Sequence, residues 1–98
     1  MIYIESFRNN QIVHLRGGEK ETVRSTMTML EEKLCGDDVF IRIHKSFIVS
    51  CEFVKSFGHG DVILKNGDIV PVGRAYYVGG IEKYMNRVKL RGAKTIKH

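Results

Sequence analysis

The chain has few of the residues that form covalent or metal cross-links. Its 98 residues include two cysteines, one proline and no tryptophan. Cys35 and Cys51 are widely separated and neither belongs to a C-x-x-C pair, which excludes a zinc ribbon and a disulfide scaffold. We interpret both as small apolar fillers, with a redox-sensing pair as the alternative. This cysteine usage is typical of a reducing cytoplasm.

Long hydrophobic runs are also missing. No apolar stretch approaches the roughly 18 residues that a membrane-spanning helix needs. The first five residues, M-I-Y-I-E, lack the basic and apolar regions of a signal peptide. The sequence therefore predicts a cytoplasmic protein without a membrane partner.

Motifs for catalysis, metals and cofactors are absent as well. The four histidines are dispersed without HxxxH or HExxH spacing, and there is no GxGxxG or Walker loop. His44, Lys45 and Ser46 are consecutive, so on a strand they alternate between faces and cannot act together as a nucleophile and its base. We predict a protein that is not an enzyme and that uses no metal or cofactor.

Charge is unevenly distributed along a chain whose length suits one domain. The net charge is +5, but the segment from Lys83 to the C-terminus holds six basic residues and no acid. The remaining residues, 1–82, therefore sum to −1. We divide the chain into a domain at 1–90 and a basic tail at 91–98. The tail either attracts phosphate groups or is simply solvated.

Short apolar runs separated by turn signals predict six to eight strands in antiparallel hairpins. The turn signals include Gly17-Gly18 and Asn66-Gly67, the second typical of a type I′ turn with positive φ at both positions. A stripe from Val23 to Leu34 predicts one short helix, capped by Ser25 or Thr26. A second helix is expected after Arg74. The predicted inward-facing residues of the two helices are Val23, Met27, Leu30 and Leu34, then Tyr77, Ile81 and Tyr84 or Met85.

Three polar clusters fall at the ends of predicted strands. Residues 8–11 form a hairpin tip, residues 44–46 interrupt an otherwise apolar run, and Arg74 with Tyr76 follows the last strand. Arginine, lysine, asparagine and glutamine are the residue types that contact bases and phosphates. The clusters therefore suggest a nucleic-acid surface, provided that the fold brings them together.

Four sequence blocks resemble the LytTR DNA-binding domain. They are Y-I-E-S at 3–6, T-M-x-x-L-E-x-x-L at 26–34, F-I-R-I-H-K-S-F-I-V-S at 40–50 and L-x-N-G-x-I-x-P-V-G-R at 64–74. The family pattern is roughly YIES, SLxxLExxL, FxRIHRSYIVN and LxNGxxIPVSR. Order and spacing agree from Tyr3 to about Val88.

The resemblance implies a mainly β, β-rich α+β fold: an elongated stack of small antiparallel sheets with one or two short helices. It implies the output domain of a bacterial two-component response regulator, with an upstream receiver domain and a histidine kinase. Such domains bind double-stranded promoter DNA sequence-specifically with loops in successive major grooves, and a homodimer on tandem repeats is expected. By position, the DNA-binding candidates are Arg8, Asn9, Asn10, Gln11, His44, Lys45, Ser46, Arg74 and Tyr76.

The sequence departs from the family pattern at several points. Ser50 replaces the usual Asn and Gly73 the usual Ser. Family domains also begin one or two strands before YIES, so an N-terminal edge strand could be missing. That would leave a sheet edge open for a protein-interaction module. Single-stranded RNA binding would instead need exposed aromatics, for which the candidates are Tyr3, Phe7, Phe53 and Phe57.

Overall fold

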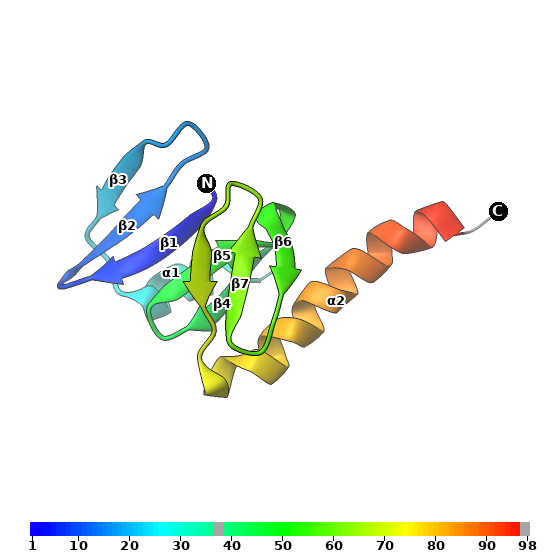
Figure 1. Cartoon of the computed structure of the whole chain (residues 1–98). Helices are drawn as coiled ribbons and strands as arrows, with labels where there is room; N and C mark the ends of the chain where they lie inside the picture. The colour runs from blue at the N-terminus through cyan, green and yellow to red at the C-terminus, as the bar shows by residue number, and fades with distance from the viewer. Residues whose placement is uncertain (37–38, 97–98) are drawn as a thin grey trace.

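The chain forms two antiparallel sheets flanked by two helices (Figure 1). The computed structural model describes residues 1–36 and 39–96, with side chains up to Val88. The principal extents are 49 × 30 × 24 Å, so the molecule is elongated. The predicted fold class is confirmed: the protein is mainly β and built from small antiparallel sheets.

The larger sheet has five strands in the order β3-β2-β1-β5-β4. Strand β1 is central, because Tyr3 lies opposite His14 of β2 on one side and Val49 of β5 on the other. The Y-I-E-S strand is therefore paired along both sides and offers no open edge. The strand bounds are β1 (Tyr3–Phe7), β2 (Asn10–His14), β3 (Lys20–Val23), β4 (Phe40–His44) and β5 (Phe47–Ser50).

The smaller sheet follows a short 3-10 turn at Cys51–Phe53. It consists of β6 (Val54–Phe57), β7 (Asp61–Leu64) and β8 (Ile69–Pro71), paired in sequence order. Pro71 ends the edge strand β8, a position where a missing N–H removes no bond from the interior of the sheet.

Two hairpin loops share one conformation. In each, a residue before the loop donates its N–H to the carbonyl four positions on: Leu15 to Glu19, and Leu64 to Asp68. Gly18 and Gly67 then adopt φ of 85° and 94°. Asn66 has no positive φ, so the predicted type I′ turn was wrong. The loop is four residues long and needs only one left-handed residue, which glycine supplies.

The apolar run at 39–50 divides into two strands at Lys45-Ser46. This pair forms a tight turn between β4 and β5, with a register shift between Arg42 and His44. The polar interruption in the sequence is therefore a hairpin turn, although it lacks the usual glycine or asparagine signal.

Helix α1 (Met27–Leu34) begins where the sequence predicted. Thr26 caps it, because its hydroxyl oxygen accepts a hydrogen bond from the N–H of Met29 at 3.1 Å. At the other end, the N–H of Cys35 donates to the carbonyl of Glu31. The helix covers one face of the larger sheet.

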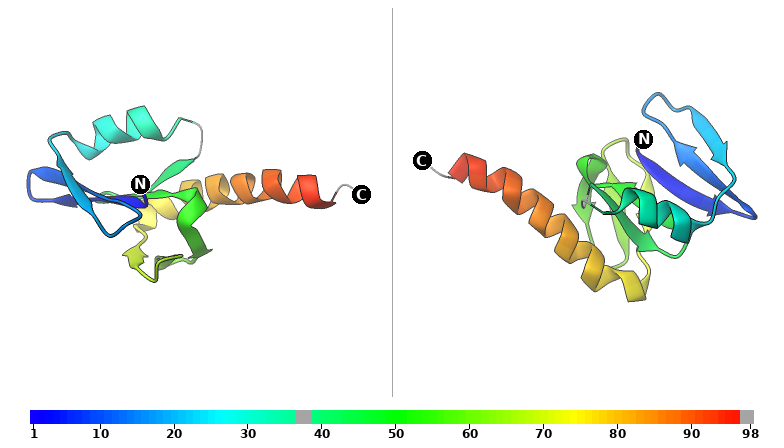
Figure 2. Two further views of the ribbon diagram at one scale, coloured as in Figure 1. Left: turned by 90° about the horizontal axis from the view of Figure 1, so that it is seen from above. Right: turned by 180° about the vertical axis from the view of Figure 1, so that it is seen from behind.

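Helix α2 (Arg74–Ile96) is longer than expected, with 23 residues. Its first half packs on Phe57, whose ring lies 6.2 Å from Tyr77 and 5.5 Å from Tyr84. A Cβ at Gly80 would lie 3.1 Å from the Phe57 ring, so glycine permits this close approach. Beyond this contact, α2 projects away from the sheets in every view (Figure 2).

The two faces of the larger sheet bury separate apolar clusters. Ile4 and Ile48 pack toward α1. Ile41, Val49 and the inner residues of the smaller sheet pack on the opposite face, where Tyr77 and Tyr84 complete the cluster. Strands β1, β4 and β5 thus contribute residues to both clusters. Because these strands are packed on both faces, the turns at their ends are held in place.

Candidate DNA-binding surface

The fold brings the three predicted polar clusters to one end of the molecule. The N–H of Ser6, near the end of β1, donates to the carbonyl of Ser46 at 2.8 Å. The N–H of Gly73, just before α2, donates to the carbonyl of Ile43 at 2.7 Å. The β1–β2 turn, the β4–β5 turn and the start of α2 therefore lie along one side of the fold, at the lower left in Figure 1. We call this surface, formed by Arg8, Asn9, Lys45, Ser46 and Arg74, the rim.

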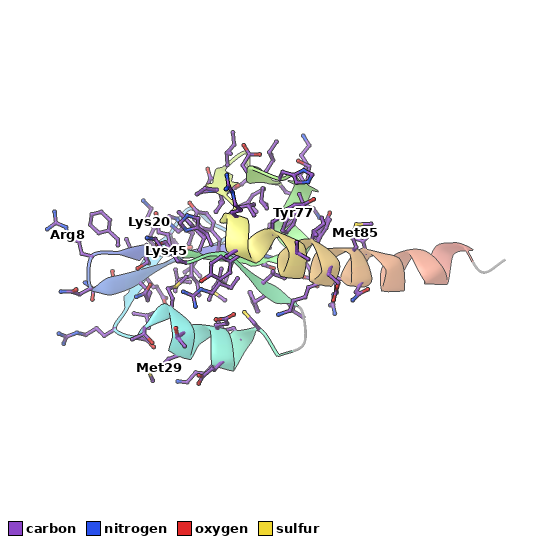
Figure 3. The ribbon with its side chains drawn as sticks, turned by 90° about the horizontal axis from the view of Figure 1, so that it is seen from below. Arg8, Lys20, Met29, Lys45, Tyr77 and Met85 are labelled. Carbon is purple, nitrogen blue, oxygen red and sulfur yellow. The ribbon has the colours of Figure 1, made fainter. Side chains whose placement is uncertain are left out.

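The β1–β2 turn forms one end of the rim. Arg8 and Asn9 connect the strands and are both exposed, and Arg8 projects from the hairpin (Figure 3). Asn10 is half-buried as the first residue of β2, opposite Phe7.

Gln11 is not part of the rim. Its side chain is buried, with 5% exposed, and its amide nitrogen donates to the carbonyl of Ser25 at 2.9 Å. The residue therefore ties β2 to the segment that enters α1. The sequence suggested an exposed hairpin tip from residue 8 to 11, but the tip is only two residues long and Gln11 lies one position inside the strand.

The β4–β5 turn is held from within by Arg42, which the sequence analysis did not select. Its guanidinium donates to the carbonyl of Lys45 at 2.7 Å and to the carbonyl of His44 at 3.4 Å. The same group forms a salt bridge with Glu31 of α1 at 2.9 Å. A charged residue at a half-buried strand position needs such partners. The position of Arg42 within an apolar strand sequence could therefore have indicated its structural role.

His44 and Ser46 are also engaged within the turn. The imidazole Nδ1 of His44 accepts a hydrogen bond from the N–H of Ser46 at 3.0 Å, and the ring meets Phe47 edge-on at 5.5 Å. Both residues are half-buried, whereas Lys45 is exposed. The turn thus presents the lysine side chain on a backbone that its neighbours constrain.

The start of α2 packs directly against this turn. A Cβ at Gly73 would lie 3.5 Å from the Cα of His44 and 3.1 Å from the ring of Tyr76. Tyr76 is half-buried, and the Arg42 guanidinium lies 5.5 Å from its ring centroid. Arg74 itself is exposed as the first residue of the helix. Tyr76 therefore supports the surface, and Arg74 is presented on it.

The cations of the rim are available to a ligand. Among the described residues, neither Lys45 nor Arg74 has a carboxylate within salt-bridge distance. The carboxylate of Glu5, on β1, bonds His14 at 2.6 Å. The first turn of α2 contains no acidic residue, so its positive end is not neutralised locally.

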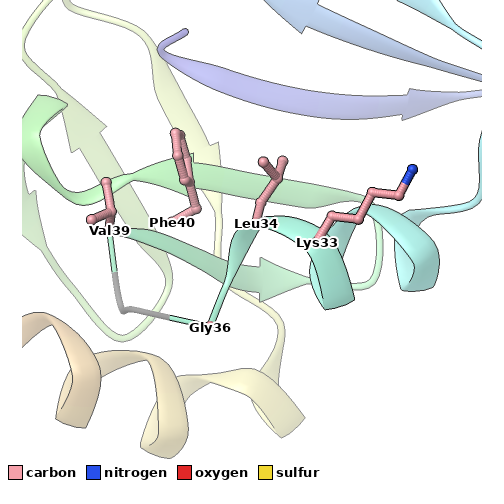
Figure 4. A pocket seen from close by; sticks show the side chains of 5 residues that line it. All are labelled: Lys33, Leu34, Gly36, Val39 and Phe40. Atoms are coloured by element: carbon pink, nitrogen blue, oxygen red, sulfur yellow. The ribbon is translucent and has the colours of Figure 1, made fainter.

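Two hollows elsewhere on the surface do not suit DNA. One, of about 510 Å³, has three acidic residues in its lining, Glu5, Glu19 and Asp68, against one lysine, Lys20. This excess of acidic residues disfavours phosphate. Tyr3 also borders this hollow, and its burial, with further contributions from Asp68 and Glu5, raises its pKa to about 12. The other hollow, of about 400 Å³, lies where β4 begins, away from the β4–β5 turn, and is lined by Lys33, Leu34, Gly36, Val39 and Phe40 (Figure 4).

The remaining chemistry of the chain is structural. Cys35 and Cys51 are both buried, each in a different apolar cluster, as expected of apolar fillers. Burial, with a further contribution from Glu31, raises the pKa of the Cys35 thiol to about 11. Over residues 1–36 and 39–96, no cluster of three histidine, cysteine or carboxylate side chains is placed to bind a metal. Within the same ranges, no helix is both long and apolar enough to cross a membrane.

The aromatic residues do not form a base-stacking platform. Tyr3 is buried, and Phe53 and Phe57 pack against the core. Phe7 alone of the four candidates is exposed. The structure therefore gives no support to the single-stranded RNA alternative.

Comparison with known proteins agrees with the architecture and with the four sequence blocks. The sequence profile of the LytTr DNA-binding domain family matches residues 1–85. The match covers most of the chain, and the chain belongs to this family. The family is defined as a DNA-binding domain and is not an enzyme class.

Two bacterial proteins illustrate the likeness. One is a solved LytTr DNA-binding domain, from a protein of Bacillus cereus described as a methyl-accepting/DNA response regulator. It superposes with a TM-score of 0.68 at 27% identity, over 86% of this chain and 79% of that one. The other is the sensory transduction protein LytT of Bacillus subtilis strain 168, 38% identical over 60 residues. That alignment covers 56% of this chain and 24% of the relative, so the aligned part of the chain spans about a quarter of that protein.

Proposed function

We propose that the rim binds double-stranded DNA sequence-specifically, with its turns entering the major groove. The observation that carries this proposal is that the β1–β2 turn, the β4–β5 turn and the start of α2, from separate parts of the sequence, lie along one side of the fold. Together they present Arg8, Lys45 and Arg74. Arginine and lysine contact guanine and phosphate, and asparagine contacts adenine, so Asn9 adds a second kind of base contact.

The start of α2 gives the rim a site for the DNA backbone. A helix N-terminus favours an anion because its first N–H groups lack partners within the helix. Arg74 at this position adds a full positive charge. We assign Arg74 to a base or phosphate at the groove edge, and Lys45 to the groove beside it. The half-buried candidates would then act indirectly, by stabilising the turns that present these side chains: Asn10, His44, Ser46 and Tyr76.

We further propose that the chain is the output domain of a bacterial response regulator that controls transcription in the cytoplasm. The named relatives and the family support this role. A receiver domain and a histidine kinase would then act upstream, and two copies would bind adjacent repeats. The selection experiment described next also tests for repeats, because a dimer on DNA selects a motif that occurs twice at fixed spacing.

The direct test is selection from a library of random duplexes, followed by measurement of affinity against salt concentration. We expect an enriched motif, and a binding constant that falls as salt rises because phosphate contacts release counterions. Salt-dependent binding without an enriched motif would contradict base contact by the rim. Equal binding of a single strand and a duplex would contradict the groove assignment.

A further inference from the structure

Phe7 is an exposed aromatic residue beside the rim that the proposed function does not yet use. Its side chain is 55% exposed at the end of β1, although burying a phenylalanine is favourable by roughly 2 kcal/mol. The guanidinium of Arg8 lies over its ring, 5.4 Å from the centroid. The other large exposed apolar residues of the described chain are Met29, Ile63, Ile69, Val78 and Met85. None of these belongs to the three turns of the rim.

The strand register explains why Phe7 is uncovered. Alternate residues of a strand share a face, so Phe7 shares a face with Glu5 and Tyr3. Glu5 pairs with Phe47 of β5, which packs on the core beneath the smaller sheet. Phe7 lies two residues further along β1, beyond its pairing with β5. Its ring therefore lies beyond the apolar cluster that includes Tyr3 and Phe47, with Glu5 between Tyr3 and Phe7 on the same face.

The turn that follows holds Arg8 in an unusual backbone conformation. Its φ is 58°, and no other described non-glycine residue has a positive φ. The first position of a two-residue hairpin turn with this φ is normally glycine, and an L-residue there is strained by about 1 kcal/mol. Because this position is occupied by arginine, its guanidinium sits on the Phe7 ring, and the two side chains form one unit with an apolar and a cationic part.

We propose that the Phe7 ring contacts the C5-methyl group of a thymine in the major groove. This inference rests on the proposed function and specifies one of the bases that the rim contacts. Thymine is the only base that presents an apolar group in that groove, and phenylalanine is among the side chains that contact it. Arg8, on the same unit, faces the neighbouring base or phosphate. Phe7 is thus a specificity-determining residue of the β1–β2 turn.

The test replaces thymine by deoxyuridine, which lacks only the methyl group. The probe is the duplex enriched by selection, with each thymine replaced in turn, and the protein is the full chain. For the unaltered protein we expect one replacement to reduce affinity about fourfold, the effect of one buried methyl group. Phe7→Ser should bind that duplex and its thymine parent equally. Phe7→Leu should keep part of the preference, because an apolar contact remains.

Matched controls separate this contact from general effects. Met29→Ser alters a residue of similar exposure, 51%, on α1, and should keep the full thymine preference. Phe7 is exposed, so Phe7→Ser should unfold at nearly the same temperature as the unaltered chain, and circular dichroism checks this.

Three outcomes would overturn the inference. The preference could persist in Phe7→Ser, which would assign the methyl contact to another residue. Alternatively, replacement of every thymine in turn could leave the affinity unchanged, which would show that Phe7 contacts no thymine methyl group. Phe7→Ser could also abolish self-association measured by light scattering while keeping the preference, which would make the ring a contact between two copies. If selection yields no motif at all, the proposed function fails and not this contact alone.

Discussion

The rim and the projecting half of α2 both carry basic residues, and the two regions are arranged differently. The rim gathers its cations from three distant parts of the sequence, each on a turn fixed by hydrogen bonds. The six basic residues from Lys83 onward instead fall within one short segment of the sequence. The backbone positions of the first five belong to α2, whose second half projects away from the sheets. At about 1.5 Å per residue, residue 91 lies roughly 25 Å along the helix from Arg74. The surface that we propose for base contact is therefore not the part of the sequence with the highest density of basic residues.

The largest effect is expected from removing the exposed cations of the rim. Lys45→Ala and Arg74→Ala should each reduce affinity for the selected duplex by roughly 1–3 kcal/mol if they contact bases. Fluorescence anisotropy at fixed salt measures this. Lys65→Ala is the matched control, because Lys65 is also an exposed turn lysine but lies in the β7–β8 loop. Binding by both rim variants at the unaltered affinity would refute the assignment.

An intermediate effect on stability and DNA affinity is expected from Arg42→Lys, which keeps the positive charge but replaces the planar guanidinium by an ammonium group. Lysine cannot bond the carbonyls of His44 and Lys45 and also Glu31 in the same geometry. We expect the free energy of unfolding to fall by roughly 1–3 kcal/mol, since charge-assisted bonds are lost. Specific DNA affinity should fall as well.

Urea unfolding and amide NMR shifts of the β4–β5 turn distinguish the two consequences. If the turn shifts stay unchanged while affinity falls, Arg42 would itself contact DNA and would not act by holding the turn. If neither changes, the hydrogen bonds to the turn contribute nothing that lysine cannot replace.

The smallest effect is expected from deleting residues 91–98. Backbone atoms of α2 extend to Ile96, while residues 97 and 98 fall outside the described range, so the predicted tail is in part a continuation of the helix. The backbone of α2 from residue 91 onward is roughly 25 Å along the helix from Arg74. This is more than the roughly 8 Å over which charges act at physiological salt. Affinity should fall by less than about tenfold, equally for the selected and random duplexes, with a shallower salt dependence. A larger loss of affinity for the selected duplex than for random duplexes would indicate that this segment contacts the DNA specifically.

Most of the fold could be predicted because its signals are local. The helix capped by Thr26, the hairpins and the inward-facing stripe on each helix follow from neighbouring residues. In α2, Tyr84 packs on the core and Met85 is exposed, a choice between adjacent positions that only the packing decides.

The site was less predictable because its shape depends on contacts between distant residues. The clusters were identified by residue type, and the sequence blocks indicated their positions. The turn at Lys45-Ser46 carries no glycine signal, and the side chain of Arg42, three residues away, donates to its backbone. Gln11 appeared to be a surface residue, because nothing in the sequence indicates that Ser25 lies beside it.

The salt bridge between Arg42 and Glu31 also has a genetic consequence. Glu31 lies on α1, on the face of the sheet opposite the smaller sheet, and is not part of the rim. Yet it holds the guanidinium that fixes the β4–β5 turn. If the proposed function holds, a screen for variants that lose specific DNA binding should recover changes at Glu31. Suppressors of those changes should cluster around Arg42 and Thr28, the other α1 residue that the guanidinium contacts.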